Sequence, residues 1–171
     1  GGTLLTTPEA LTEFVGRANE QFGQAGLALD FDPATDIVVA DPPAGVDLTD
    51  GTRIADEDGE MGLLTAALTS GDSDTITVFY VDDLNGPLGS GYRGYAYWGG
   101  FNARSIYLNS NPFAQHFTLA HELMHVVLEE GHFDEPYQIL TAGTSISNGV
   151  ESSKRIPLDD ATRLLSSPYV V

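Results

Sequence analysis

The segment from Phe117 to Pro136, FTLAHELMHVVLEEGHFDEP, holds three of the four histidines of this 171-residue chain. His121, Glu122 and His125 form the pattern H-E-x-x-H. Residues i and i+4 of a helix point to the same side, so two imidazoles with this spacing could reach one metal ion. The glutamate would lie beside that ion without binding it and could accept a proton from water. The pattern therefore predicts one catalytic zinc ion, with Glu122 as general base and acid.

The residues around the motif favour a buried helix, which would be a rigid platform for metal ligands. The Asn111-Pro112 pair is typical of a helix start. Apolar residues then recur with a period of about 3.6, which indicates one face turned to the core. These residues are Phe117, Ala120, Met124, Val127 and Leu128.

The third zinc ligand requires the helix to end soon after the motif. Catalytic zinc sites usually have three protein ligands, and His132 is the first candidate. In a straight helix, His132 would lie about 16 Å along the axis from His121. We therefore predict that the helix ends between Leu128 and Gly131. Gly131 can adopt left-handed backbone angles, and such glycines often end helices.

Carboxylates are the alternative third ligands. Asp134 and Glu135 follow His132 closely. A gluzincin-like peptidase would instead take a glutamate from a later helix, and Glu151 is the one glutamate after Glu135. Its surroundings, NGVES, have little helical character, so we favour His132.

The charge of the chain excludes some partners. The 25 acidic and seven basic residues give a net charge of -18, which would repel nucleic acid and anionic membrane surfaces. There is no cysteine, so thiolate metal sites and disulfides are excluded. No apolar run approaches the roughly 20 residues of a membrane helix, and the first residues have no signal-peptide pattern. We expect an extracellular or secreted protein, a monomer rather than an oligomer, with a polypeptide as its partner.

The periodicity of the chain predicts an α+β (mixed α/β) fold with a twisted sheet and an active-site helix. We expect a single catalytic domain over residues 1–171, with an N-terminal subdomain of about 1–130 and a loop-rich C-terminal subdomain of about 131–171. Besides the motif helix, we predict helices over 8–22, 59–68 and 156–167, strands over 27–31, 36–40, 75–81 and 105–110, a loop over 41–56, and an extended edge segment over 92–98.

The motif segment resembles the active-site region of metzincin metallopeptidases, whose pattern is H-E-x-x-H-x-x-G-x-x-H. The match covers the first five positions. Leu128 stands where the family has its glycine, and His132 comes one residue late. Leu140 stands where the family has the methionine of a turn beneath the zinc. The resemblance implies a zinc endopeptidase of metzincin-like build.

The resemblance also implies where substrate would bind. In such enzymes an edge strand pairs with an extended peptide. By this analogy the rim of the cleft would be the Tyr95–Asn102 region, with Tyr95 and Trp98 as substrate contacts. Trp98 could equally be a core anchor. Tyr137 could stabilise an oxyanion, as a tyrosine after the third histidine does in some metzincins. Packing beneath the site is the favoured alternative for Tyr137.

Two further interpretations stay open. The chain could be a non-catalytic, zinc-containing binding or structural domain of a larger surface protein, although Glu122 would have no use there. Asp-rich turns at 32–36, 56–60 and 70–74 could bind Ca²⁺, but none has EF-hand spacing, and Asp is favoured in solvated turns.

Overall fold

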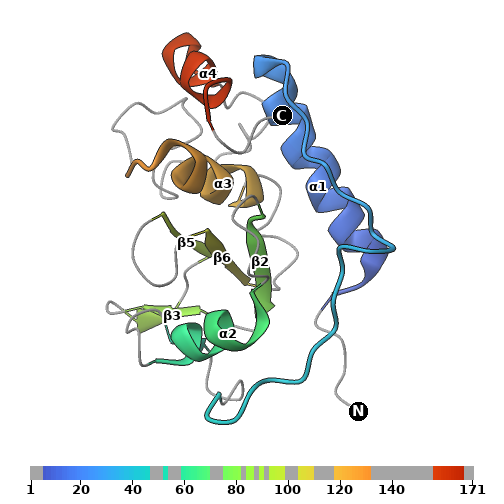
Figure 1. Cartoon of the computed structure of the whole chain (residues 1–171), viewed down its shortest axis with the longest axis vertical. Helices are drawn as coiled ribbons and strands as arrows, with labels where there is room; N and C mark the ends of the chain where they lie inside the picture. Colours follow the sequence, from blue (N-terminus) through green and yellow to red (C-terminus); the bar gives the residue numbers. More distant parts are fainter. Residues whose placement is uncertain are drawn as a thin grey trace.

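The computed structural model describes residues 6–46, 52–53, 59–69, 75–81, 84–86, 89–90, 93–98, 104–109, 118–131 and 156–167. Its elements form an α+β fold, as the sequence predicts (Figure 1). The helices are α1 (Pro8–Phe22), the 3-10 helix η1 (Gly23–Ala25), α2 (Glu60–Leu68), α3 (Thr118–Leu128) and α4 (Leu158–Leu164). The strands are β1 (Thr52–Arg53), β2 (Thr77–Val81), β3 (Leu84–Gly86), β4 (Gly89–Ser90), β5 (Gly94–Tyr97) and β6 (Ser105–Asn109).

The main sheet has the strand order β2-β6-β5. Strand β2 pairs with β6 in parallel, whereas β5 pairs with β6 antiparallel, with Gly94 opposite Leu108 and Tyr97 opposite Ser105. The described strands therefore leave β5 at an edge of this sheet, as the sequence predicts. A second, smaller sheet has the order β1-β3-β4.

Side chains of the main sheet alternate between two cores, because successive residues of a strand point to opposite faces. On β6, Ile106 and Leu108 belong to a core with residues of α1 and α3. Tyr107 points the other way and packs with Met61 of α2. Its hydroxyl donates a hydrogen bond to the Met61 carbonyl oxygen over 2.6 Å. The sheet is thus covered by α3 on one face and α2 on the other (Figure 1).

Helix α1 begins as predicted. The backbone N–H of Ala10 donates to the Thr7 hydroxyl over 3.2 Å, and Pro8 occupies the first turn, where its missing N–H costs nothing. Phe14, Ala18 and Phe22 are buried. They recur at helical spacing, so this face covers α3.

The strands predicted at 27–31 and 36–40 are wrong: residues 27–46 contain no strand, and the segment first runs beside α1 and then continues to α2, where Val46 packs (Figure 1). Side chains capture the backbone donors that a strand would use. The Leu29 N–H donates to Asn19 Oδ1 over 2.6 Å, and the Asp32 N–H donates to Asp36 Oδ2 over 2.7 Å. Val38 and Val39 are exposed, with 80% of Val38 accessible, whereas Leu27 and Leu29 are partly buried and pack against the core without strand pairing.

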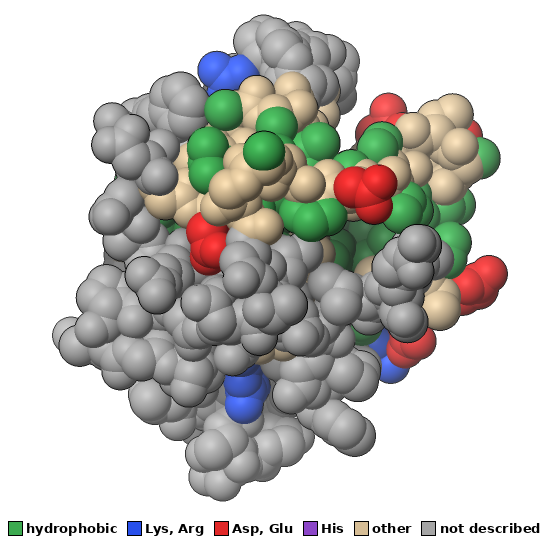
Figure 2. Space-filling view, turned by 90° about the horizontal axis from the view of Figure 1, so that it is seen from below, with side chains coloured by type: hydrophobic (Ala, Val, Ile, Leu, Met, Phe, Trp, Pro, Cys, Tyr) green, Lys and Arg blue, Asp and Glu red, His purple; other side chains and the backbone are tan. Residues whose placement is uncertain are grey.

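No helix of the described residues is long and apolar enough to cross a membrane. Seen from below, the described surface carries apolar, acidic and basic side chains, and no histidine is visible on it (Figure 2). This agrees with the burial of His121 and His125, which are 8% and 3% exposed.

Candidate metal and catalytic site

Helix α3 is the platform of the site, and it is buried on almost every side. Ala120, Leu123 and Met124 pack into the core shared with α1 and β6. A helix enclosed in this way has little freedom to rotate or tilt, so it fixes the direction of the polar side chains that it carries.

The two histidines of the motif meet on one side of α3, as their spacing predicts. Their Nε2 atoms are 3.0 Å apart, and their ring centroids are 4.6 Å apart with the rings nearly perpendicular. Two zinc–nitrogen bonds of about 2.0–2.1 Å at a tetrahedral angle would place the nitrogens roughly 3.3 Å apart. The pair therefore fits a zinc ion after a shift of a few tenths of an ångström.

His125 is oriented from two directions. Its Nδ1 lies 2.5 Å from the carbonyl oxygen of Glu130, and its ring stacks on Trp98 with centroids 5.3 Å apart and planes 22° apart. A carbonyl only accepts hydrogen bonds, so Nδ1 must carry the proton. Neutral His125 therefore keeps the lone pair of Nε2, the atom that faces His121. A metal ligand needs this tautomer.

Glu122 is the buried acid of the site. Glu122 is 6% exposed, and this burial raises the pKa of its carboxyl to about 8. The carboxyl lies against Gly94 of β5: a Cβ built on Gly94 would be 2.6 Å from Glu122 Oε1 and 2.7 Å from Thr118 Cγ2. Strand β5 therefore approaches α3 closely at the position of the catalytic candidate.

The helix ends within the interval that a third ligand at His132 would require, but the residue with left-handed backbone angles at its end is not Gly131. Helix α3 stops at Leu128, inside the predicted interval. Glu129 has a φ of 54° and is the left-handed residue, whereas Gly131 has no positive φ. The left-handed conformation for which Gly131 was the candidate is therefore adopted two residues earlier.

The remaining site predictions divide between described and undescribed parts of the chain. Trp98 lies beside His125, at the end of β5. Tyr95 is partly buried and packs on the α2 side of the sheet, and its substrate contact stays a prediction. The other residues considered for the site lie outside the described residues: His132, Asp134, Glu135, Tyr137, Leu140 and Glu151. The fourth histidine of the chain, His116, which we expect on the surface and not at the metal, also lies outside them. Within the described part, no third His, Asp or Glu joins the two histidines as a metal cluster.

Sequence reasoning missed Gly94, Glu130 and Arg163, which contact the site or its supports. An isolated glycine inside a strand signals close approach of another group, so Gly94 could have been found. Glu130 acts through its backbone carbonyl, which any residue supplies. Arg163 lies 38 positions beyond His125 (163 − 125), and no local pattern connects the two.

Comparison with known proteins gives one match. Residues 76–140, which include β2, β5, β6 and α3, match the model of the Peptidase M78 family, described as the IrrE N-terminal-like domain. A search of curated proteins and a search of solved structures gave no significant match. The matched stretch is thus similar to a metallopeptidase-like family, while the metzincin-specific spacing stays a prediction.

Proposed function

We propose that the chain is a zinc-dependent metalloendopeptidase in which His121, His125 and His132 bind one zinc ion. The observation that carries this proposal is that the Nε2 atoms of His121 and His125 lie 3.0 Å apart. The buried Glu122 follows His121 directly in the sequence. The similarity of residues 76–140 to a peptidase family supports the same class of activity.

The side chains of the site would have separate roles in peptide-bond hydrolysis. A bound zinc ion would polarise the scissile carbonyl, acidify a water molecule and, as a nearby positive charge, lower the pKa of Glu122. Glu122 accepts a proton from the attacking water at its carboxylate and then delivers it to the leaving amine nitrogen. Burial of the site excludes bulk water that would compete with this transfer.

His132 remains our choice for the third ligand. The left-handed turn at Glu129 supports it, because a chain that leaves the helix axis there can return toward His121 and His125. Glu151 in a gluzincin-like arrangement, and Asp134 or Glu135, are the alternatives that the experiment below separates.

The substrate would be a polypeptide laid along β5. This strand is at the edge of the described sheet and contacts α3 through Gly94, so a peptide paired with it would pass close to Glu122. Trp98 is 40% exposed beside His125 and is our preferred substrate contact. For Tyr137, a role at the oxyanion stays the second choice after packing beneath the site.

The proposal also covers the partners, the location and the oligomeric state of the enzyme. A net charge of -18 favours solubility and disfavours nucleic acid and anionic membranes as partners. We propose a secreted, monomeric enzyme with a single catalytic zinc ion. Ca²⁺ at the Asp-rich turns is a lesser element of the proposal.

The test combines metal content with peptide cleavage. Plasma emission spectroscopy measures zinc in the wild type, His132→Ala and the matched control His116→Ala, and a quenched-peptide library measures cleavage by each of them and by Glu122→Gln. We expect one zinc per chain in the wild type and His116→Ala, a loss in His132→Ala, and no cleavage by Glu122→Gln despite bound zinc.

Each other outcome points to a named alternative. Full zinc retention in His132→Ala would move the third ligand to a carboxylate. Stoichiometric zinc without cleavage of any peptide would favour the non-catalytic domain. A wild type without zinc would contradict the proposal.

A further inference from the structure

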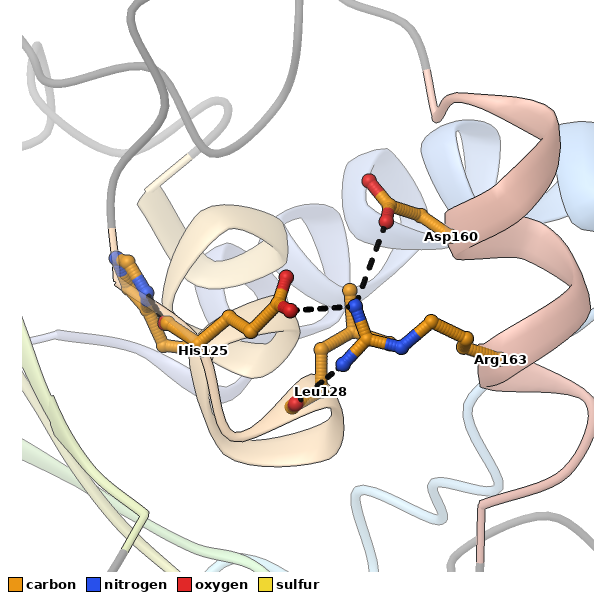
Figure 3. A network of polar contacts seen from close by, with 5 residues as sticks. His125, Leu128, Asp160 and Arg163 are labelled. Carbon is orange, nitrogen blue, oxygen red and sulfur yellow. Dashed lines mark hydrogen bonds and ion pairs between the residues drawn. The ribbon is translucent and has the colours of Figure 1, made fainter.

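Arg163 of α4 holds both sides of the turn that ends α3 (Figure 3). Its Nη2 donates to the carbonyl oxygen of Leu128 over 2.9 Å. Its Nη1 lies 2.7 Å from Glu130 Oε1 and 3.8 Å from Asp160 Oδ1. One guanidinium therefore connects the last residue of α3, the segment that follows it, and helix α4.

The turn between these contacts is one that the backbone would not adopt without support. Glu129 has a φ of 54°, a left-handed conformation that is unfavourable for residues with a Cβ. The last carbonyls of a helix also lack partners within the helix. Arg163 satisfies one of them, at Leu128, and so stabilises the point where the chain turns.

The turn brings the carbonyl oxygen of Glu130 to His125. This oxygen is the acceptor for Nδ1, at 2.5 Å. The Glu130 side chain is bound through Oε1, while Oε2 is buried without a hydrogen-bond partner among the described atoms. Among the described contacts, the ion pair with Arg163 is therefore what holds the side chain of the residue that carries this carbonyl.

The surrounding charges make Arg163 difficult to replace. Asp160 is 7% exposed, and burial followed by the charge of Glu130 raises the pKa of its carboxyl. Without the guanidinium, Glu130 and Asp160 would be like charges that face each other in a partly buried place. Their repulsion would move Glu130 away from its present position.

We propose that Arg163 is a positioning residue for the metal site, which holds the Glu130 carbonyl as acceptor for His125 Nδ1–H and thereby presents Nε2 to the metal. The inference rests on the proposed zinc function. It adds a residue of α4, which lies outside the stretch that matches the peptidase family. Partners of this kind typically change metal affinity by about 10–100-fold when they are removed.

The test compares Arg163→Ala and Arg163→Lys with Arg17→Ala. Arg17 is a matched control: it is 42% exposed against 44% for Arg163, and it pairs with one carboxylate, Glu13, on the surface of α1. The first readout is the tautomer of His125 in the metal-free protein, by NMR of ¹⁵N-labelled histidine. The second is the zinc dissociation constant, by competition with a chelating dye.

We expect wild type and Arg17→Ala to show the Nδ1–H tautomer of His125. Arg163→Ala should give a mixture of tautomers and bind zinc about 10–100-fold more weakly, with Arg163→Lys between the two. Circular dichroism checks that each variant is folded. If Arg163→Ala does not fold, Arg163→Lys and Glu130→Gln decide the question with the same two readouts.

Folded Arg163 variants with the wild-type tautomer and zinc affinity would overturn the inference. So would weaker zinc binding with an unchanged tautomer, because that would indicate a general loss of stability. Failure of the proposed function looks different: the wild type itself would bind no zinc, and the tautomer in the metal-free protein would still decide the role of Arg163.

Discussion

The Cα of Gly94 lies against the carboxyl of Glu122, with no room for a side chain between strand and helix. A Cβ at this position would be 2.6 Å from Glu122 Oε1 and 2.8 Å from Glu122 Cγ. Real Cβ atoms do not approach other atoms so closely, so any larger residue must displace the glutamate or the strand. The position of the edge strand β5 therefore fixes the position of the Glu122 carboxyl.

Gly94→Ala is expected to impair catalysis more than metal binding. The added methyl group displaces the Glu122 side chain, while His121 and His125 point to another side of α3 and keep their mutual distance of 3.0 Å between Nε2 atoms. A misplacement of about 1 Å can reduce turnover roughly 100-fold. Steady-state cleavage of a quenched peptide, with zinc content measured in parallel, checks this expectation.

Gly16→Ala is the control for Gly94→Ala, because a Cβ at Gly16 meets nothing within 4 Å. Alanine is also favoured over glycine inside a helix by about 1 kcal/mol, so this variant should be at least as stable as the wild type and fully active. Wild-type turnover by Gly94→Ala would show that β5 can move away from Glu122 without consequence.

Local patterns predicted the parts of the fold that local physics determines. Helix α3 could be predicted because its apolar residues recur at helical spacing, and β2 and β6 because their apolar residues alternate between two cores. Residues 36–40 have similar apolar content, yet Val38 and Val39 are exposed. Their pattern gave no information on whether a neighbouring strand exists to pair with them.

The candidate site could be predicted only in its local part. The i, i+4 spacing of His121 and His125 gave their convergence, and the need for a third ligand gave the end of the helix near Leu128. The supports of the site could not be predicted, because they join distant positions. Arg163 reaches the turn from α4, and Trp98 reaches His125 from the end of β5.

Glu129→Gly is expected to stabilise the protein. Glu129 is exposed and has a φ of 54°, so its side chain strains the turn. Relief of about 1–2 kcal/mol of strain, less roughly 0.5–1 kcal/mol for the added freedom of the unfolded chain, leaves a gain of about 0.5–1 kcal/mol. Thermal unfolding should show a rise in Tm of about 1–3 °C.

A Glu→Gly substitution inside a helix should lower Tm, whereas Glu129→Gly should raise it. Glu20 is exposed inside α1, so Glu20→Gly places glycine in a right-handed helix and should lower Tm. If Glu129→Gly also lowers Tm, the side chain of Glu129 contributes more than its backbone angle costs.

The metal-free protein should lose stability as pH rises through the pKa of Glu122. Burial raises this pKa from an ordinary 4.5 to about 8. Between these values the folded chain keeps a proton that the unfolded chain releases. The contribution of Glu122 is therefore fully present below pH 4.5 and is lost as pH rises through 8, at up to roughly 1.4 kcal/mol per pH unit.

Glu122→Gln cannot ionise, so in EDTA its Tm should exceed that of the wild type increasingly from pH 5 to pH 9. Glu20→Gln is the matched control, because it makes the same chemical change at an exposed position of α1. Parallel Tm profiles of the wild type and Glu122→Gln would mean that the carboxyl is not desolvated in the metal-free protein.

Trp98 should report metal binding directly, because it is the one tryptophan of the chain and its ring stacks on His125 at 5.3 Å. Titration of the metal-free protein with Zn²⁺ should change its fluorescence and saturate at one equivalent, and Co²⁺, which is paramagnetic, should quench it. His125→Ala should abolish both responses, whereas His116→Ala should keep them. If a protein that has taken up one zinc per chain shows unchanged emission, Trp98 does not sense the metal. Its stacking on His125 would then be a packing contact only.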